Sequence, residues 1–268
     1  MQVERYALYR MRLPFRQVFK HALAQRQSSE SLLLQLTSTQ GGEPLSGYGE
    51  ALPRDYVSGE TLEQTELAIR QFLPELAGVT LTDLAGVTRL CDAFEQRFEQ
   101  QQCARALLEL ALLDLLSQVR GEPIAQWFGG LQTRRIQYSA VISDEAPEGL
   151  SRLVQQMQGF AVGPLKLKVG GDLARVNAQL ELLRTHYPSH DIRLDANGAW
   201  AQTPAAEIAQ LVQQFAISSI EQPVITEDTA TLVRAHVEMK SRCEVRLVLD
   251  EQVRLPAVLD ELIGAQAL

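Results

Sequence analysis

The spacing of hydrophobic residues changes twice along the chain. The N-terminal part shows the alternation of strands, the next part shows the period of helices, and the last part shows short strand-like and helix-like segments in turn. Residues 3–12 alternate between polar and apolar side chains, and residues 31–37 form an apolar run, so both segments predict strands. From residue 61 to about residue 119, apolar positions recur at helical spacing. Residues 1–125 are therefore predicted to form an α+β domain in which a small meander precedes helices.

The start and the end of this helical stretch carry their own signals. Thr61 precedes the first apolar-periodic position and Gln64 stands three positions later, which is the spacing of a capping box. In a capping box, each of the two side chains accepts a hydrogen bond from the other residue's backbone N–H group. Gly121 and Pro123 follow the last helical positions, and both residue types stop helices. We therefore expect the first helix to begin after Thr61 and the last to end before Gly121.

From about residue 134, short apolar runs alternate strictly with amphipathic segments. This alternation predicts parallel strands that are joined by right-handed crossovers through helices. Five strand–helix units are expected, at residues 136–142 and 146–159, 164–169 and 172–186, 192–195 and 204–215, 217–221 and 228–237, and 246–250 and 256–263. The second predicted domain therefore spans residues 126–268 and consists of β/α units.

Composition excludes several classes of protein. The chain is 46% hydrophobic with a net charge of −8, which provides for a sizeable core and argues against a nucleic-acid or anionic-membrane partner. The longest apolar run, residues 106–116, is interrupted by Glu109 and Asp114 and is too short to cross a bilayer. The three cysteines lack the spacing of a disulfide framework or a zinc site, which favours the reducing cytoplasm.

Basic and acidic side chains end the predicted strands at a near-constant interval. Lys166 and Lys168 are followed by Asp195, Glu221 and Asp250, at intervals of roughly 26–29 residues. This interval is close to the length of one βαβ unit, about 30 residues. Because the carboxyl ends of parallel strands meet at one edge of a sheet or barrel, we expect these five side chains to converge.

These residue types suit a site that holds a cation and moves a proton. Lys166 and Lys168 lie one residue apart, so they share a face of a strand and repel each other, which lowers a lysine pKa towards that of a base. Three carboxylates offer the hard oxygen ligands that Mg²⁺ prefers. A carboxylate at the buried end of a strand also needs a partner, and a metal ion is one way to supply it.

Each of these residues also has an ordinary explanation. A lysine at a strand end can simply be solvated, and a carboxylate there can cap the next helix or lie on the surface. Asn197 stands two residues after Asp195, where it can either hydrogen-bond a group behind the ligands or occupy a βα turn. Recurrence of the acids at the same place in consecutive units favours a shared site.

The strand-end segments, in this order, resemble the enolase superfamily. They are most similar to the mandelate racemase and muconate lactonizing enzyme subgroup, which includes dipeptide epimerases, N-acylamino acid racemases and o-succinylbenzoate synthases. Residues 47–51, 57–61 and 106–115 are similar to the capping domain of that family. The resemblance implies an α+β capping domain and a TIM-type barrel, a modified (β/α)7β barrel in the family, of which about five β/α units are present here.

The resemblance also implies a role for each strand-end residue. Lys168 would be the base on one face of the substrate and Lys166 its electrostatic neighbour. A Mg²⁺ ion, or alternatively Mn²⁺, would be held by three ligands: Asp195, Glu221 and Asp250. The metal ion and the lysines would stabilise the enediolate that forms when a proton leaves the carbon next to a carboxylate.

Two further groups of residues receive roles from the same resemblance. Asn197 and Glu251 would hydrogen-bond to groups behind the ligands. Two loops of the capping domain, residues 19–26 and 53–56, would close over the substrate and select it. The candidate substrate-loop residues are Phe19, His21, Arg26, Arg54 and Tyr56.

The hypothesis that follows is an enzyme that racemises or epimerises a small carboxylate, either a dipeptide or an N-acyl amino acid. One alternative is a cycloisomerase or an o-succinylbenzoate synthase, a lyase that would need only the base Lys168. Another is a truncated, inactive homologue, because family members continue into a sixth strand that carries a second lysine on the opposite face of the substrate. A homo-oligomer is an option that nothing in the sequence specifies.

Overall fold

The computed structural model of the chain describes residues 1–21, 24–40, 42–143, 147–157, 160, 162–253 and 256–267, except for the side chains of residues 16–21, 24–25, 40, 147–148 and 256–257. It separates into two compact units. The first contains Met1–Phe19 and Gln25–Arg134, and the second contains Lys20–Ala24 and Arg135–Leu268. The domain boundary expected after residue 125 stays a prediction.

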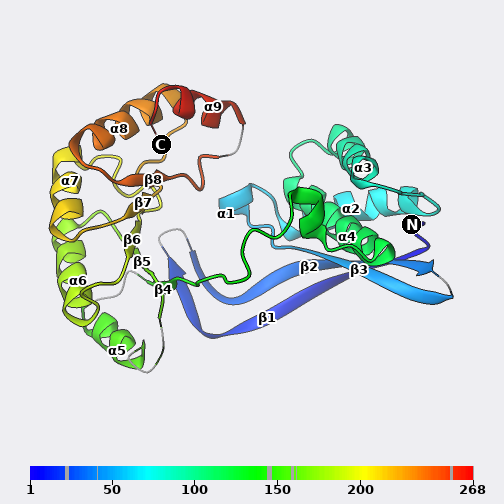
Figure 1. The fold of residues 1–268 in the computed structure, drawn as a ribbon, viewed down its shortest axis with the longest axis horizontal. Coiled ribbons are helices and arrows are strands. Elements are labelled where there is room, and N and C mark those ends of the chain that lie inside the picture. Colours follow the sequence, from blue (N-terminus) through cyan, green and yellow to red (C-terminus); the bar gives the residue numbers. More distant parts are fainter. Residues whose placement is uncertain are drawn as a thin grey trace. The chain divides into compact units, whose positions relative to one another are not determined.

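The first unit is a three-stranded sheet covered by helices (Figure 1). Its strands, in the spatial order β1-β2-β3, are β1 (Arg5–His21), β2 (Ala24–Gln40) and β3 (Glu43–Ala51). Its helices are α1 (Asp55–Ser58), α2 (Leu62–Leu76), α3 (Leu84–Arg97), α4 (Gln102–Arg120) and the 3-10 helix η1 (Ile124–Phe128). The first two strands are longer than the alternation alone predicted, and the long helical stretch consists of three helices.

Helix α4 packs directly on the backbone of β3, because β3 carries glycine where the two elements touch. A Cβ atom on Gly47 would lie 2.2 Å from the backbone nitrogen of Leu115, and one on Gly49 would lie 2.1 Å from the carbonyl oxygen of Leu107. Real side chains never approach a backbone this closely. The contact between sheet and helix therefore depends on the absence of side chains at these two positions.

The capping signals predicted at Thr61 are present. The Thr61 hydroxyl accepts a hydrogen bond from the backbone N–H of Gln64 at 3.2 Å, and the Gln64 side chain accepts one from the N–H of Thr61 at 3.0 Å. The neighbouring Glu60 is 2% exposed, and its carboxylate accepts a hydrogen bond from the backbone N–H of Cys103 at 2.9 Å. Glu60 thus caps the start of α4, whose own N-cap residue makes no side-chain hydrogen bond.

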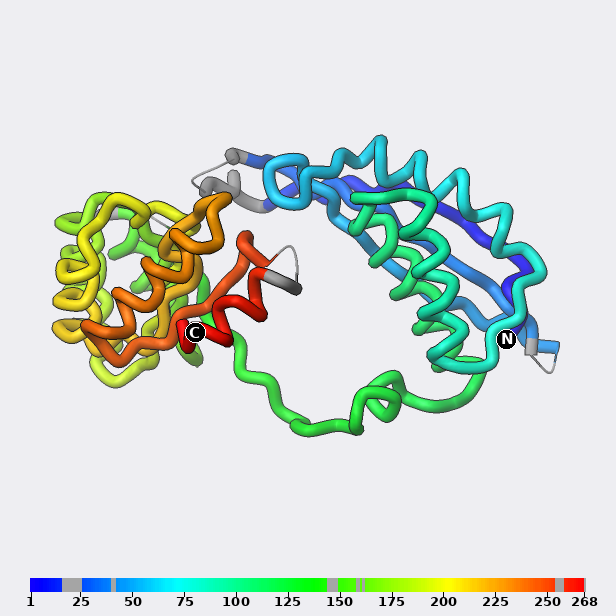
Figure 2. The backbone as a smooth tube through the Cα atoms, turned by 90° about the horizontal axis from the view of Figure 1, so that it is seen from above, coloured from blue at the N-terminus to red at the C-terminus, as the bar shows by residue number. Residues whose placement is uncertain are grey.

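The second unit is a sheet of five parallel strands with a helix after each strand, as the alternation predicts. The strands run in chain order as β4 (Ala140–Ile142), β5 (Leu165–Lys168), β6 (Ile192–Asp195), β7 (Ser219–Glu221) and β8 (Arg246–Val248). The helices are α5 (Pro147–Met157), α6 (Leu173–His186), α7 (Ala205–Gln214), α8 (Thr229–Arg242) and α9 (Pro256–Gly264). Figure 2 shows the helices of this unit following one another from green to red.

Strand β4 is shorter than the apolar pattern predicted, because only its last residues pair with β5. The Ile136 and Tyr138 side chains, which precede it, are 76% and 83% exposed. Strand β8 likewise ends at Val248, so Asp250 lies beyond the strand. Both differences arise because backbone pairing, and not apolarity alone, sets where a strand begins and ends.

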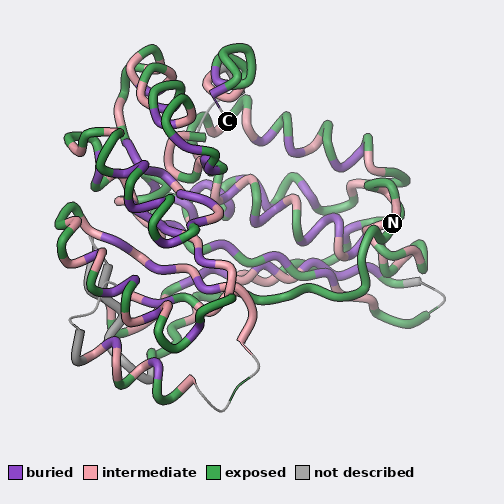
Figure 3. Tube along the Cα trace, turned by 60° about the vertical axis from the view of Figure 1, so that its left-hand side comes forward, coloured by how far each residue is buried: buried purple, intermediate pink, exposed green. Residues whose placement is uncertain are grey.

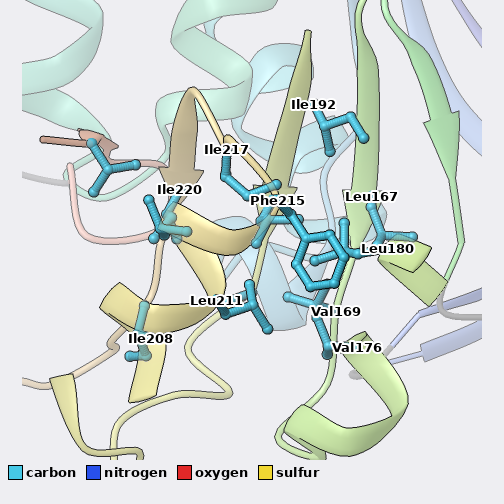
Figure 4. Packing of buried hydrophobic residues seen from close by; sticks show 14 of the residues in the cluster. Leu167, Val169, Val176, Leu180, Ile192, Ile208, Leu211, Phe215, Ile217 and Ile220 are labelled. Carbon is cyan, nitrogen blue, oxygen red and sulfur yellow. The ribbon is translucent and has the colours of Figure 1, made fainter. Parts of the chain in front are cut away.

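Between the strands and helices of the second unit lies a continuous hydrophobic core. In Figure 4, Leu167 of β5 approaches Leu180 of α6 and Phe215, which follows α7. Buried and exposed positions alternate along the helices, as the purple and green segments of Figure 3 show. No helix in the described part of the chain is both long enough and apolar enough to span a membrane.

Replacing Gly49 with alanine should destabilise the first unit by at least about 2 kcal/mol, because the new methyl group collides with the backbone of α4. The measurement is urea-induced unfolding. Gly264→Ala is the matched control, since a Cβ atom there meets nothing within 4 Å. An equally small effect of both substitutions would contradict the close packing of β3 on α4.

The buried histidine of α8 should make stability depend on pH. His236 is 0% exposed, and burial together with the charge of Lys240 lowers its pKa, although the backbone of Ala267 opposes this in part. The unfolded chain then binds a proton more readily than the folded chain. The free energy of unfolding should therefore have its full value above about pH 6.5 and should fall as the pH drops below it. Denaturant titrations at several pH values test this.

The variant His236→Leu should lose this part of the pH dependence. His186→Leu serves as the control, because His186 is an exposed histidine of the same unit. A fall in stability towards acid that is the same in the parent chain and in His236→Leu would rule out this histidine as its source.

Candidate active site

The register of the second sheet aligns the candidate lysines and acids on neighbouring strand ends. Lys168 of β5 pairs with Asp195 of β6, and Asp195 pairs with Glu221 of β7. Glu221 in turn pairs with Val248, the last residue of β8, so that Asp250 follows two residues later. Residues that are far apart in the sequence therefore meet at the carboxyl edge of the sheet.

Two lysine ammonium groups lie directly against the carboxylates. Lys166 Nζ is 2.7 Å from both carboxylate oxygens of Glu221 and 3.0 Å from Asp195 Oδ2. Lys168 Nζ is 2.8 Å from the same Oδ2 atom and 3.0 Å from Asn197 Oδ1. Asp195 is 1% exposed, so this buried carboxylate receives both cations on one oxygen.

This arrangement shifts the pKa values of its members in opposite directions. Burial by itself raises the pKa of Asp195, but the hydrogen bonds and charges of Lys168 and Lys166 outweigh it and hold the pKa below its ordinary range. Burial lowers the pKa of Lys166, but Glu221 and Asp195 outweigh it and raise the pKa. The expectation that the neighbouring ammonium group lowers the lysine pKa is therefore wrong for Lys166 in this structure, because the carboxylates dominate.

The lysines are also unusual in this chain. It contains four lysines against 21 arginines, and two of the four stand on β5. An arginine keeps its proton under all ordinary conditions, whereas a lysine can release it when its surroundings change. A chain that mostly uses arginine for its positive charges thus has half of its lysines on β5, next to the acids Asp195 and Glu221.

The third acid, Asp250, lies in the same electrostatic environment. Partial burial raises the pKa of its carboxyl group, and the negative charges of Glu251, Glu221 and Asp195 raise it further. Among the described residues, no group of three or more histidine, cysteine, aspartate or glutamate side chains stands close enough together to hold a metal ion. The donor set nevertheless fits a hard divalent cation, because carboxylates on adjacent strand ends repel one another and a cation would relieve that repulsion.

Asn197 connects Lys168 to Glu251, the acid that follows Asp250 in the chain. Its Oδ1 atom accepts a hydrogen bond from Lys168, and its Nδ2 group donates one to Glu251 Oε1 at 2.8 Å. Its backbone adopts the left-handed conformation, with φ of 42°. Asn197 therefore has both features considered for it from sequence, a turn conformation and a bridging side chain.

The candidate substrate-loop residues fall into two groups. Phe19 and His21 belong to β1, but their side chains lie outside the described residues. Arg26, Arg54 and Tyr56 line one pocket of about 290 Å³ in the first unit. The atoms Arg26 Nη1 and Arg54 Nε are buried and have no hydrogen-bond partner among the described residues.

Several acids also line this pocket, but most have partners of their own. Glu60 caps α4, Glu63 accepts a hydrogen bond from Arg10 at 3.2 Å, and Glu30 lies 3.6 Å from Arg12. With Asp55, four carboxylates and two arginines line the pocket, so its capacity to bind an anionic group rests on the two guanidinium nitrogen atoms and not on its net charge.

One residue at the carboxyl edge belongs to a strand-end segment of the sequence but received no role there. Gln222 follows Glu221, is fully buried, and hydrogen-bonds the backbone of the segment after β8. The available signal was a polar amide side chain that directly continues a predicted buried strand. That signal identifies a residue that needs hydrogen-bond partners, but it cannot say which segment supplies them.

Comparison with known proteins gives a consistent result. Residues 149–268 match the family described as enolase C-terminal domain-like. A hydrophobic dipeptide epimerase from Citrifermentans bemidjiense is 30% identical over 270 residues, covering 90% of this chain and 69% of that protein. An L-Ala-D/L-Glu epimerase from Bacillus subtilis is 28% identical over 274 residues, covering all of this chain and 71% of that protein.

Solved structures agree with the sequence relatives. The substrate-liganded L-Ala-D/L-Glu epimerase from Bacillus subtilis superposes with a TM-score of 0.84 at 25% identity, covering all of this chain and 73% of that one. A dipeptide epimerase from Cytophaga hutchinsonii, complexed with Mg and the dipeptide D-Ala-L-Val, has the same fold, with a TM-score of 0.86 at 22% identity over all of this chain and 70% of that one. The sheet of parallel strands and the separate antiparallel cap thus match a capping domain with part of a TIM-type barrel.

Proposed function

Because this chain belongs to the enolase superfamily, in its mandelate racemase and muconate lactonizing enzyme subgroup, we propose that it abstracts the proton next to a substrate carboxylate in a Mg²⁺-dependent epimerisation of dipeptides. The relatives of the chain are epimerases, racemases and a synthase, so it is a member of a family of isomerases and lyases. The observation that carries the proposal is the lysine pair of β5 against Asp195 and Glu221 of the neighbouring strands.

Lys168 is the proposed base. Its Nζ atom is held at the carboxyl end of β5 by two acceptors, Asp195 Oδ2 and Asn197 Oδ1, which restrict where the amine can point. As a neutral amine, it takes the proton from the carbon next to the substrate carboxylate. Lys166, which stands on the same face of β5, supplies a positive charge beside the anion that forms.

Asp195, Glu221 and Asp250 are the proposed ligands of the metal ion. They offer only oxygen donors, which suits Mg²⁺ and also admits Mn²⁺. A divalent cation held by these residues would supply positive charge that lowers the free energy of an enediolate. Dipeptide epimerases from Cytophaga hutchinsonii and Methylococcus capsulatus have been solved with Mg and a dipeptide, which supports the same choice of ion here.

Replacing Lys168 with alanine should reduce exchange of the substrate α-proton by about 100- to 10,000-fold, because the proton then lacks a positioned base. The measurement is incorporation of deuterium into a panel of dipeptides in heavy water with Mg²⁺, followed by mass spectrometry. Lys240→Ala is the matched control, since Lys240 lies on α8 and belongs to neither the lysine pair nor the acid set.

Deuterium exchange catalysed by the unsubstituted parent chain tests the proposal as a whole. Exchange that requires Mg²⁺ and disappears with a chelator supports it, whereas no metal-dependent exchange with any dipeptide would contradict it. An o-succinylbenzoate synthase from Enterococcus faecalis is 26% identical to the chain, so a lyase is the other outcome tested. Release of an aromatic product from the synthase substrate, without exchange of dipeptides, would assign that reaction.

The pocket of Arg26, Arg54 and Tyr56 is the proposed site for the distal end of the substrate. The buried guanidinium atoms of Arg26 and Arg54, which have no hydrogen-bond partner in the part of the chain that the structure describes, support a substrate that carries a second anionic group, such as an acidic side chain. Residues Phe19 and His21 stay proposals that rest on the family resemblance. The small size of the pocket, about 290 Å³, suits a single side chain.

Replacing Arg54 with methionine should raise KM for a dipeptide with an acidic side chain by roughly 10- to 100-fold, because a charge-assisted hydrogen bond is lost. The value of KM for a neutral dipeptide should change little. Arg70→Met is the control, since Arg70 pairs with Glu66 on α2 and does not line the pocket. An equal change in KM for acidic and neutral dipeptides would show that the pocket does not distinguish substrates by their charge.

A further inference from the structure

Gln222 is a fully buried glutamine whose hydrogen-bonding groups all have partners. Its Oε1 atom accepts from the backbone N–H of Asp250 at 2.8 Å and of Gln252 at 3.3 Å. Its Nε2 group donates to the carbonyl oxygen of Val224 at 2.7 Å. Its backbone N–H donates to the carbonyl of Val248 at 2.8 Å, so the residue links the ends of β7 and β8 through both backbone and side chain.

The backbone of Gln222 is held in an unfavourable conformation. Its φ angle is 42°, a left-handed conformation that residues other than glycine seldom adopt. The Gly198 N–H donates to its carbonyl oxygen at 2.7 Å, which ties the same residue to the turn after β6. Strain of this kind persists only where the surrounding contacts impose it, and here they direct the side chain towards the segment after β8.

The segment after β8 depends on this side chain. Strand pairing ends at Val248, so the N–H groups of Asp250 and Gln252 have no partner on a neighbouring strand. Instead, the Gln222 amide oxygen accepts a hydrogen bond from each of these two N–H groups. In return, the Gln252 side chain accepts a hydrogen bond from the N–H of Thr226 at 3.3 Å, so two glutamines cross-brace the segments that follow β7 and β8.

Electrostatics favour such a brace. Asp250 is affected by the negative charges of Glu251, Glu221 and Asp195, and the positive charge of Lys166 offsets only part of their effect. Repulsion between these groups favours movement of the Asp250 turn away from the other acids. A backbone clamp opposes that movement without adding charge, because a glutamine side chain is neutral.

We propose that Gln222 is a positioning residue that holds the Asp250 turn at the carboxyl edge of the sheet, so that the Asp250 carboxylate can join Asp195 and Glu221 in binding a divalent cation. The inference rests on the proposed function in one respect, namely the role of Asp250 as a ligand. Gln222 itself offers no atom to the cation, since its amide oxygen already accepts two backbone hydrogen bonds.

The first test needs no variant. In the metal-free parent chain, the N–H groups of Asp250 and Gln252 should exchange with deuterium as slowly as those of β8, although they lie outside the strand. Amide exchange followed by nuclear magnetic resonance measures this. Exchange of both groups at the rate of an open loop would overturn the clamp.

The second test removes the clamp at nearly constant volume. In Gln222→Met, exchange at the two N–H groups should accelerate at least tenfold, and the dissociation constant for Mg²⁺, measured by titration calorimetry, should rise by about 10- to 100-fold. Gln222→Glu keeps the acceptor and should keep the two N–H groups protected. Gln179→Met, which replaces another fully buried glutamine of the same unit, should change neither readout.

The outcomes separate this inference from the proposed function. Mg²⁺ binding that is equally tight in the parent chain and in Gln222→Met would overturn the positioning role alone. Absence of Mg²⁺ binding by the parent chain would overturn the ligand role of Asp250 and this inference with it. An equal loss of affinity in Gln179→Met would show that the effect is general destabilisation, and it would also overturn the positioning role.

Discussion

The carboxyl edge of the second unit depends on one buried carboxylate, Asp195. A charged group that is 1% exposed must be paired, and here a single oxygen of Asp195 accepts hydrogen bonds from both Lys166 and Lys168. The two lysines therefore compensate the charge of the buried acid, and Glu221 shares one of the two cations. Removing either kind of partner would leave an uncompensated charge in the protein interior.

This ion cluster is possible only because the strand register is correct. On β5, Leu165 and Leu167 enter the hydrophobic core while the two lysines point to the other face. A slip of one residue would move the lysines into the core and the leucines to the acids, so packing and chemistry select the same register. The core of the second unit, and not the ion pairs, is thus what places the charged groups at one edge.

In the first unit, a different constraint decides which charged groups are paired, because acids there have structural roles. Its core is closed by direct contact of β3 with α4, and the carboxylate of Glu60 is used to cap that helix. With acids engaged in this way, Arg26 and Arg54 keep buried nitrogen atoms that lack hydrogen-bond partners among the described residues. The proposed preference of the pocket for an anionic group rests on these nitrogen atoms.

Most of the fold was predictable from sequence, because the period of apolar residues reports directly on strands and helices. The alternation of strands and helices, the capping box of Thr61 and Gln64, and the meeting of strand ends all follow from local patterns and chain order. The spacing of Lys168, Asp195 and Glu221 likewise sufficed to place them side by side, since parallel neighbours share one edge.

Tertiary structure decided what those side chains do to one another. Local patterns could not show that carboxylates outweigh the second ammonium group at Lys166, that β8 stops before Asp250, or that Gln222 holds the turn beyond it. Each depends on distances between segments about 30 to 55 residues apart in the chain. The sequence by itself determined which residues reach the edge, and only the packed structure determined their partners, the direction in which those partners shift the pKa of Lys166, and the segment that supports them.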